Sequence, residues 1–278
     1  MTGEIAVCVD GSAGSRAAFD WAVREAQLRG RPLEAVHVSS LPDEEALATW
    51  PYLREPAPDA WVKELTETHP GIRAKAVGLV GEAAPALLSF RSAADLTVLG
   101  LRGAGGFPEL AVGSVAHRVA ERSDSPVVLV PSGSRSAGGA RLSGPVVLGI
   151  DARDPAGTAT EFAFEAAHRR GTVLHAVHAW HFPSPAGQWM PYGVPEEDRG
   201  GWEDQEVQLL SDALRPWREK HPRVRVCQDV LLKTPPAALV EASSSAGLLV
   251  VGRAGTALGP TLRAVLEHTR CPVAVVPS

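Results

Sequence analysis

Three glycines and a serine at fixed spacing are the residues of this sequence best suited to binding chemistry. They are Gly100, Gly103, Gly113 and Ser114, and they follow an apolar run at residues 96–99. Glycine lets a backbone approach a ligand closely, and the first amides of a helix point toward an anion. A buried strand, a glycine loop and a helix that begins at Ser114 would together hold phosphate groups. The Ser114 hydroxyl could cap that helix or donate to a ligand oxygen.

The usual phosphate-binding fingerprints do not occur in this loop. There is no Gly-x-x-x-x-Gly-Lys-Ser/Thr, and hence no P-loop lysine, and no Gly-x-Gly-x-x-Gly directly follows the first strand. Arg102, inside the loop, could supply positive charge to a phosphate or could be an ordinary solvated loop residue. The alternative for the whole segment is a structural loop with Ser114 as a helix cap.

A carboxylate stands where the first apolar run ends. Asp10 follows residues 5–9 and precedes Gly11 and Ser12. At the carboxyl end of a strand, this side chain could accept hydrogen bonds from a bound ligand. The alternative is a turn-forming residue, helped by Gly11.

Composition and charge narrow the classes of function. The chain has 278 residues, 45% of them apolar, and a formal net charge of −5. This length suits two ordinary domains, and the absence of a basic run argues against a nucleic-acid partner. The three cysteines are far apart, which favours a reducing cytoplasm over a disulfide framework. No signal-peptide pattern and no apolar run of about 20 residues occur, so we expect no membrane partner.

Metal and catalytic constellations are not evident along the chain. His175, His178 and His181 invite a metal interpretation, but the first two lie on a predicted strand and point to opposite faces. We find no zinc-type spacing and no Ser–His–Asp order. The sequence therefore predicts no metal ligands and no catalytic residues.

Strands and helices alternate along the first half of the chain. Apolar runs are separated by segments with helical periodicity, and they occur at residues 5–9, 33–38, 72–80, 96–99 and 126–130. This alternation predicts a mostly parallel sheet with helices on both faces.

The same succession of strands and helices then occurs a second time in the chain. Val146–Asp151 repeats Ile5–Asp10 at an offset of 141 residues, which becomes 152 at Gly252 and 146 at Gly259. The second copy is therefore longer in its Pro-rich middle, near residues 180–200, and shorter in its glycine loop. We predict two homologous domains, at 1–132 and 144–278, joined by a linker at 133–143.

The motif Gly100-x2-Gly103-x9-Gly113-Ser114 resembles the nucleotide-binding motif of the universal stress protein family. The whole chain resembles tandem members of that family. Each half has an opening strand that ends in Asp, a strand with a Val-His pattern and a closing Pro-Val-x-Val-Val strand. The resemblance implies two repeated Rossmann-like α/β domains, each with a five-stranded, mostly parallel sheet and helices on both faces.

The resemblance also implies a ligand and its site. ATP, with Mg2+ on its phosphates, would occupy the N-terminal domain. Asp10 would lie near the adenosine, where it could accept from an adenine amino or a ribose hydroxyl group, and the backbone of Val38 would meet adenine. The ribose and phosphate motif would be Gly100, Gly103, Gly113, Ser114 and Val115, with Arg102 inside it.

The second half departs from this pattern. Asp151-Ala152-Arg153 replaces Asp-Gly-Ser, so we expect a bulkier charged side chain in its cleft. Ala179 replaces the strand-end valine, and the shortened loop ends in Gly259-Pro260, which removes a hydroxyl and a backbone N–H. We predict no ATP in this half, whose task would be to pair with the first half.

Taken with this resemblance, the residues predict an ATP-binding stress-response protein of the cytoplasm. The nucleotide would be regulatory, with negligible turnover, and the family resemblance adds homodimers as an expectation. One alternative is a nucleotide-independent scaffold that uses the Trp-bearing stretch 180–202, or the surface where the halves pair, to recruit a partner. The other is a nucleotide-activating ligase or transferase, which would need further basic or catalytic groups facing the cleft.

Overall fold

A computed structural model describes residues 3–39, 58–90, 94–103, 111–133, 144–182 and 196–278. The strands are β1 (Glu4–Cys8), β2 (Leu33–Ser39), β3 (Ala74–Val80), β4 (Ala94–Gly100), β5 (Val127–Val130), β6 (Val146–Gly149), β7 (Leu174–Trp180), β8 (Val226–Leu232), β9 (Leu248–Arg253) and β10 (Val273–Pro277). The helices are α1 (Ala13–Arg29), α3 (Pro58–Thr68), α4 (Ala83–Phe90), α5 (Ser114–Arg122), α6 (Gly157–Arg170), α8 (Glu196–Lys220), α9 (Pro235–Ser243) and α10 (Pro260–His268). Residues 134–143 of the expected linker lie outside the description.

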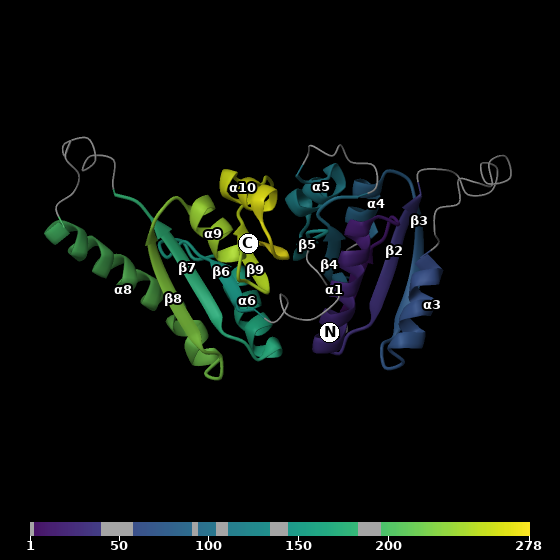
Figure 1. The fold of residues 1–278 in the computed structure, drawn as a ribbon, viewed down its shortest axis with the longest axis horizontal. Coiled ribbons are helices and arrows are strands. Elements are labelled where there is room, and N and C mark those ends of the chain that lie inside the picture. Colours follow the sequence, from purple (N-terminus) through teal and green to yellow (C-terminus); the bar gives the residue numbers. More distant parts are fainter. Residues whose placement is uncertain (1–2, 40–57, 91–93, 104–110, 134–143, 183–195) are drawn as a thin grey trace.

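All the described strands belong to one ten-stranded sheet, in the order β3-β2-β1-β4-β5-β10-β9-β6-β7-β8 (Figure 1). Neighbouring strands within each half are parallel, whereas β5 and β10 pair antiparallel at the centre. The predicted fold class is therefore confirmed, and the two sheets are continuous. Val128 pairs with Ala274, its own counterpart in the repeat, so a pseudo-twofold axis passes beside this pair.

Helices cover both faces of the sheet. One apolar cluster packs under α1, α3, α6 and α8, and the other packs under α4, α5, α9 and α10. Strand residues point alternately to the two faces, so nearly continuous runs of Val, Leu and Ala become buried on both sides. Among the described residues, no helix combines the length and the apolar character that a membrane span requires.

The first helix of each half is bounded by matching signals. The Ser12 hydroxyl accepts from the Ser15 amide at the start of α1. Gly30 and Gly171 end α1 and α6 with φ of 62° and 60°, a left-handed conformation that glycine adopts at little cost. These two glycines are 141 residues apart, so the helix boundaries repeat along with the sequence.

The two halves meet through a buried ionic cluster between α1 and α6. The carboxylate of Glu25 is 1% exposed, and its two oxygens lie 2.5 Å from Arg29 Nε and 2.5 Å from Arg170 Nη2. Each guanidinium also stacks across the boundary, Arg29 over Phe162 and Arg170 over Trp21. Both pairs repeat at 141 residues, so these contacts obey the pseudo-twofold symmetry, and only Glu25 breaks it.

Candidate functional site

The residues predicted to bind nucleotide all line one cleft in the N-terminal half. The cleft has a volume of about 250 Å³, and it opens where β1, β2 and β4 end. Its lining includes Asp10, Val38, Gly100, Arg102, Gly103, Gly113, Ser114 and Val115. Residues from four separate segments of the sequence are therefore brought together, at the edge of a parallel sheet where ligands of such folds bind.

Close backbone approaches form the floor of this cleft. A Cβ added to Gly100 would lie 2.6 Å from the carbonyl carbon of Gly14, and a Cβ added to Gly14 would overlap the carbonyl oxygen of Arg102. The end of β4 and the start of α1 therefore touch backbone to backbone. Only glycine fits at such positions, and the contact fixes the loop after β4 against α1.

Gly14→Ala is expected to lower the free energy of unfolding by about 2–3 kcal/mol, because the atom that must give way is backbone. In an ordinary helix, the same change stabilises by up to about 1 kcal/mol. Gly157→Ala in α6 is the matched control, since its added Cβ would meet only Trp217 Cζ2 at 3.6 Å. Urea unfolding of both variants tests this expectation, and equal effects at the two positions would contradict it.

Asp10 has a structural role within the cleft. Its Oδ1 accepts a hydrogen bond from the Ser12 amide at 3.0 Å, which is the Asx turn considered as an alternative. Its Oδ2 lies against the loop, because a Cβ on Gly103 would be only 2.5 Å from that atom. One oxygen therefore shapes the turn, while the other lies between the turn and the glycine loop.

Helix α5 begins at Ser114 itself, one residue earlier than it would if Ser114 were its N-cap. Gly113 is the N-cap, with φ of −71° and ψ of 149°, and Ser114 is the first helical residue and is exposed. The prediction that Ser114 could cap this helix was therefore wrong. The first intrahelical bond joins the His117 amide to the Gly113 carbonyl at 2.9 Å. The amides of residues 114–116 precede it and point out of the helix end.

The Arg102 side chain connects the two described ends of the glycine loop. Its Nε donates to the carbonyl oxygen of Ala111 at 3.1 Å, so it links the two described ends of the segment around residues 104–110, which lie outside the description. The side chain is exposed and lines the cleft. This contact fits the interpretation of Arg102 as a loop residue and leaves its charge at the cleft.

One wall of the cleft was missed by sequence reasoning. It is apolar and comes partly from α4, and its residues are Val36, Ala83, Leu87, Leu99 and Ala116. No motif marks these positions, because they differ from core residues only in facing a cavity. The helical pattern after residue 82 was the available signal, since a helix that follows β3 begins at the carboxyl edge of the sheet.

His37 and His178 repeat a structural contact, as their matching positions suggested. His37 Nδ1 donates to the Val9 carbonyl oxygen at 2.8 Å, and His178 Nδ1 lies 3.1 Å from the Ile150 carbonyl oxygen. Both carbonyls belong to the residue that follows the opening strand of its half. Each histidine therefore ties the second strand to the turn after the first.

In the C-terminal half, a charged cluster lies beside the equivalent turn, which is kept by a hydrogen bond from the Arg153 amide to Asp151 Oδ1 at 3.0 Å. The Glu206 carboxylate of α8 is 1% exposed, and it lies 3.1 Å from His178 Nε2 and forms an ion pair with Arg153. Burial favours a raised pKa for Glu206, but the hydrogen bonds from Arg153 and His178 outweigh it and hold the pKa below its usual value. The guanidinium of Arg153 is thus held at α8, which corrects the expectation that it enters the cleft.

The shortened glycine loop of this half folds onto the core. Leu258 is 2% exposed and packs in the cluster under α10, next to the N-cap Gly259. Pro260 is the first residue of α10, so the helix lacks the N–H that Ser114 supplies in α5. A Cβ on Gly252 would meet the Ala156 side chain at 2.7 Å, so a side chain now packs where Gly100 faces backbone.

Comparison with known proteins establishes the relationship suggested by the motif. The model of the universal stress protein family matches residues 1–131 and again residues 143–277. This chain belongs to the universal stress protein family. Universal stress protein Rv2005c of Mycobacterium tuberculosis is 32% identical over 295 residues, which cover 98% of this chain and 96% of the relative. The crystal structure of a universal stress protein from Archaeoglobus fulgidus aligns over 100% of this chain and 99% of its own, with a TM-score of 0.68 at 18% identity.

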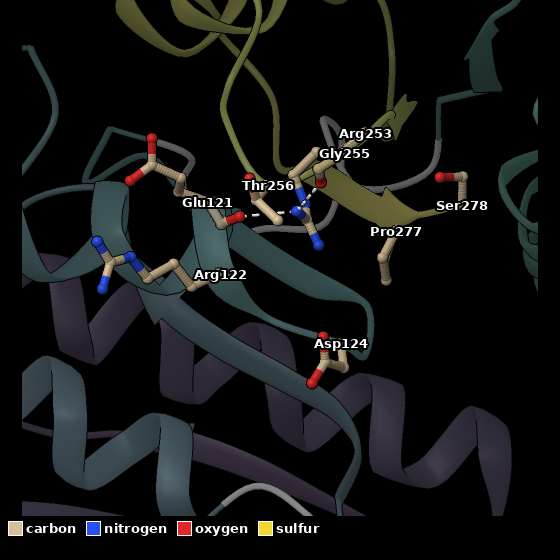
Figure 2. A pocket seen from close by; sticks show the side chains of 8 residues that line it. All are labelled: Glu121, Arg122, Asp124, Arg253, Gly255, Thr256, Pro277 and Ser278. Atoms are coloured by element: carbon tan, nitrogen blue, oxygen red, sulfur yellow. Dashed lines mark hydrogen bonds between the residues drawn. The ribbon is translucent and has the colours of Figure 1, made fainter.

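This universal stress protein has a second, larger cleft of about 710 Å³ where its two halves meet (Figure 2). Arg253 extends into this junction and is 5% exposed. Its guanidinium donates to the carbonyl oxygens of Glu121 at 2.7 Å, Ser123 at 2.5 Å and Gly255. A cation that satisfies the last carbonyls of α5 stabilises the helix end. We therefore interpret this side chain as a brace between the halves.

The Trp-bearing stretch 180–202 begins at the end of β7 and ends within α8. Trp180 is buried at the end of β7 and packs edge-on against Phe182, with ring centroids 5.0 Å apart. Residues 196–202 begin the long helix α8, where Trp202 is 37% exposed. Trp189 lies outside the described residues.

Proposed function

We propose that this protein binds ATP in its N-terminal cleft, as a regulatory ligand in a cytoplasmic stress response. The supporting observation is the convergence of every predicted site residue on one cleft beside the N-terminus of α5. All these residues belong to the N-terminal half of the chain. The C-terminal half serves as the pairing partner that completes the ten-stranded sheet.

The chemistry of the lining suits the parts of a nucleotide. The apolar wall formed by Leu87 and Leu99 offers contact to a base, and Asp10 offers carboxylate oxygens to amino or hydroxyl groups. Gly103, Gly113 and the α5 amides offer a concave backbone surface for phosphates, which added Cβ atoms would narrow. Mg2+ would be held largely by the phosphate oxygens and by water.

The same lining predicts negligible turnover. Phosphoryl transfer needs positive charge at the transferred group and a side chain that orients the nucleophile. The described residues of the cleft include no lysine, and Arg102 is already bonded to the Ala111 carbonyl. A related ligase or transferase would need additional basic groups, so we favour a regulatory role for ATP.

Calorimetric titration of the full chain with ATP and Mg2+ tests the proposal. We expect one ATP per chain, because the shortened loop and Pro260 deprive the C-terminal half of its phosphate cradle. Two ATP molecules per chain would contradict the assigned asymmetry. No binding would contradict the proposal and favour the nucleotide-independent scaffold. Mass spectrometry of ligand released from denatured protein would reveal whether another adenine nucleotide is carried instead.

A further inference from the structure

Three side chains with metal-binding chemistry meet on the outer strands of the C-terminal half. His175 of β7 pairs directly with Cys227 of β8, and Asp229 follows two residues along β8. Residues at this spacing project from the same face of a sheet. One ligand atom from each, an imidazole nitrogen, the thiol sulfur and a carboxylate oxygen, all lie within 4.8 Å of one another.

The three side chains are accessible to solvent, and the strands that carry them pair in a regular ladder. The side chains of His175 and Asp229 are 24% and 43% exposed, and Cys227 is exposed. Further along the same face, Val177 and Leu231 pack in the core cluster under α9. The regular β7–β8 ladder fixes the backbone of all three residues, so an ion from solvent could reach them without unfolding any element.

The repeat supplies an internal comparison. Glu34 and Lys75 form the equivalent cross-strand pair between β2 and β3, and Val77 takes the place of Asp229. There the Lys75 ammonium group pairs with the Glu34 carboxylate and lies 3.5 Å from the Glu4 carboxylate. In the N-terminal half, the Lys75 ammonium group thus provides a positive charge at the position equivalent to Cys227. The C-terminal half has instead a thiol, an imidazole and a carboxylate.

We propose that His175, Cys227 and Asp229 bind a zinc ion, with water as the fourth ligand. Thiolate, imidazole and carboxylate are the ligands that Zn2+ takes in proteins, in tetrahedral geometry. Ligand atoms of such a site lie about 3.3–3.8 Å apart, so small side-chain rotations suffice here. His175 Nε2 and Asp229 Oδ2, now 2.5 Å apart, would separate by about 1 Å to admit the ion.

The competing interpretation is a cross-strand His–Asp pair beside a solvent-exposed cysteine. The two interpretations differ in what they require of Cys227. A His–Asp pair does not involve the sulfur, whereas a zinc site needs it as thiolate, and binding then releases protons. Sequence reasoning predicted no metal here because the ligands lie on two strands separated by α8, with no characteristic spacing along the chain.

The test uses tag-free full-length protein, stripped with a chelator and dialysed against Zn2+ alone. We expect one zinc per chain by elemental analysis. We also expect a thiolate-to-metal charge-transfer absorption when Co2+ replaces Zn2+. Cys227→Ser should abolish this absorption and weaken zinc binding at least about 100-fold, since losing even an outer-shell partner costs 10–100-fold. His175→Gln and Asp229→Asn should also weaken binding.

Cys8→Ser is the matched control, because it removes another cysteine that forms no disulfide and lies far from this cluster in the sequence. It should leave zinc stoichiometry and the cobalt absorption unchanged. Retention of the absorption in Cys227→Ser, its loss in Cys8→Ser, or failure of the wild type to retain zinc would overturn the proposal. Thermal melts of every variant establish that each is folded. ATP titration is a separate measurement, so failure here is distinguishable from failure of the proposed nucleotide site.

Discussion

Replacing Glu25 with glutamine is expected to lower the free energy of unfolding by about 3–5 kcal/mol, the range for breaking a buried ion pair. The Glu25 carboxylate is almost fully buried between Arg29 and Arg170 at the contact between α1 and α6. Glutamine keeps the shape of the side chain but removes its charge. Two largely buried guanidinium groups would then remain without their shared counterion.

The pH dependence of this effect follows from the pKa of Glu25. Burial alone would raise that pKa, but the positive charges of Arg170 and Arg29 outweigh it and lower the pKa below the usual value for glutamate. A carboxyl group with a depressed folded-state pKa contributes stability above its unfolded pKa and loses it as pH falls through the folded value. The difference between the wild type and Glu25→Gln should therefore be full above about pH 5 and shrink as the pH falls through the folded-state pKa.

Urea unfolding at a series of pH values measures both effects. Glu165→Gln is the matched control, because Glu165 pairs with Arg169 at 2.9 Å on α6 but is 44% exposed. An exposed pair of this kind contributes at most about 1 kcal/mol. If the two variants lost equal stability, or if the Glu25 effect did not change with pH, the cluster would not have the role assigned to it here.

The fold could be predicted because its sequence signals are local and occur in both halves of the chain. Apolar runs of four to nine residues predicted the strands, and glycines such as Gly30 and Gly171 predicted the helix ends. The antiparallel pairing of β5 with β10 depends on contacts between segments far apart in the sequence, and the sequence analysis predicted only that the two halves pair. The Glu25 cluster could not be predicted, since its symmetry-related position is Ala166 and no local pattern marks a carboxylate that contacts another domain.

The predicted site residues converge because motif residues at strand ends of a parallel sheet share one edge. Residues whose roles depend on tertiary contacts could not be identified in this way. Leu87 resembles any core leucine, and Glu206 resembles any charged residue of a long helix, until the fold places them at a cleft and beside His178. Ser114 shows a limit of another kind, because helix boundaries inferred from sequence are uncertain by a residue or more.

The double substitution Gly113→Val with Ser114→Ala is expected to weaken ATP binding at least about 100-fold, which corresponds to about 2.7 kcal/mol. A Cβ on Gly113 would lie 3.6 Å from the Gly103 amide nitrogen, an ordinary contact that the fold can accept. The valine methyl groups would extend beyond it, into the space between the two glycines where phosphates are proposed to bind. Loss of the Ser114 hydroxyl removes one donor at the same place.

Gly259→Val provides the matched control for this experiment. Gly259 is the N-cap of α10 just as Gly113 is the N-cap of α5, with similar backbone angles of −65° and 168°. A Cβ there meets no atom within 4 Å, so the fold should tolerate it. Calorimetry should give unchanged ATP affinity for Gly259→Val and lost affinity for the double variant, with both melting near the wild type. Unchanged affinity in the double variant would contradict the placement of the nucleotide phosphates at the N-terminus of α5.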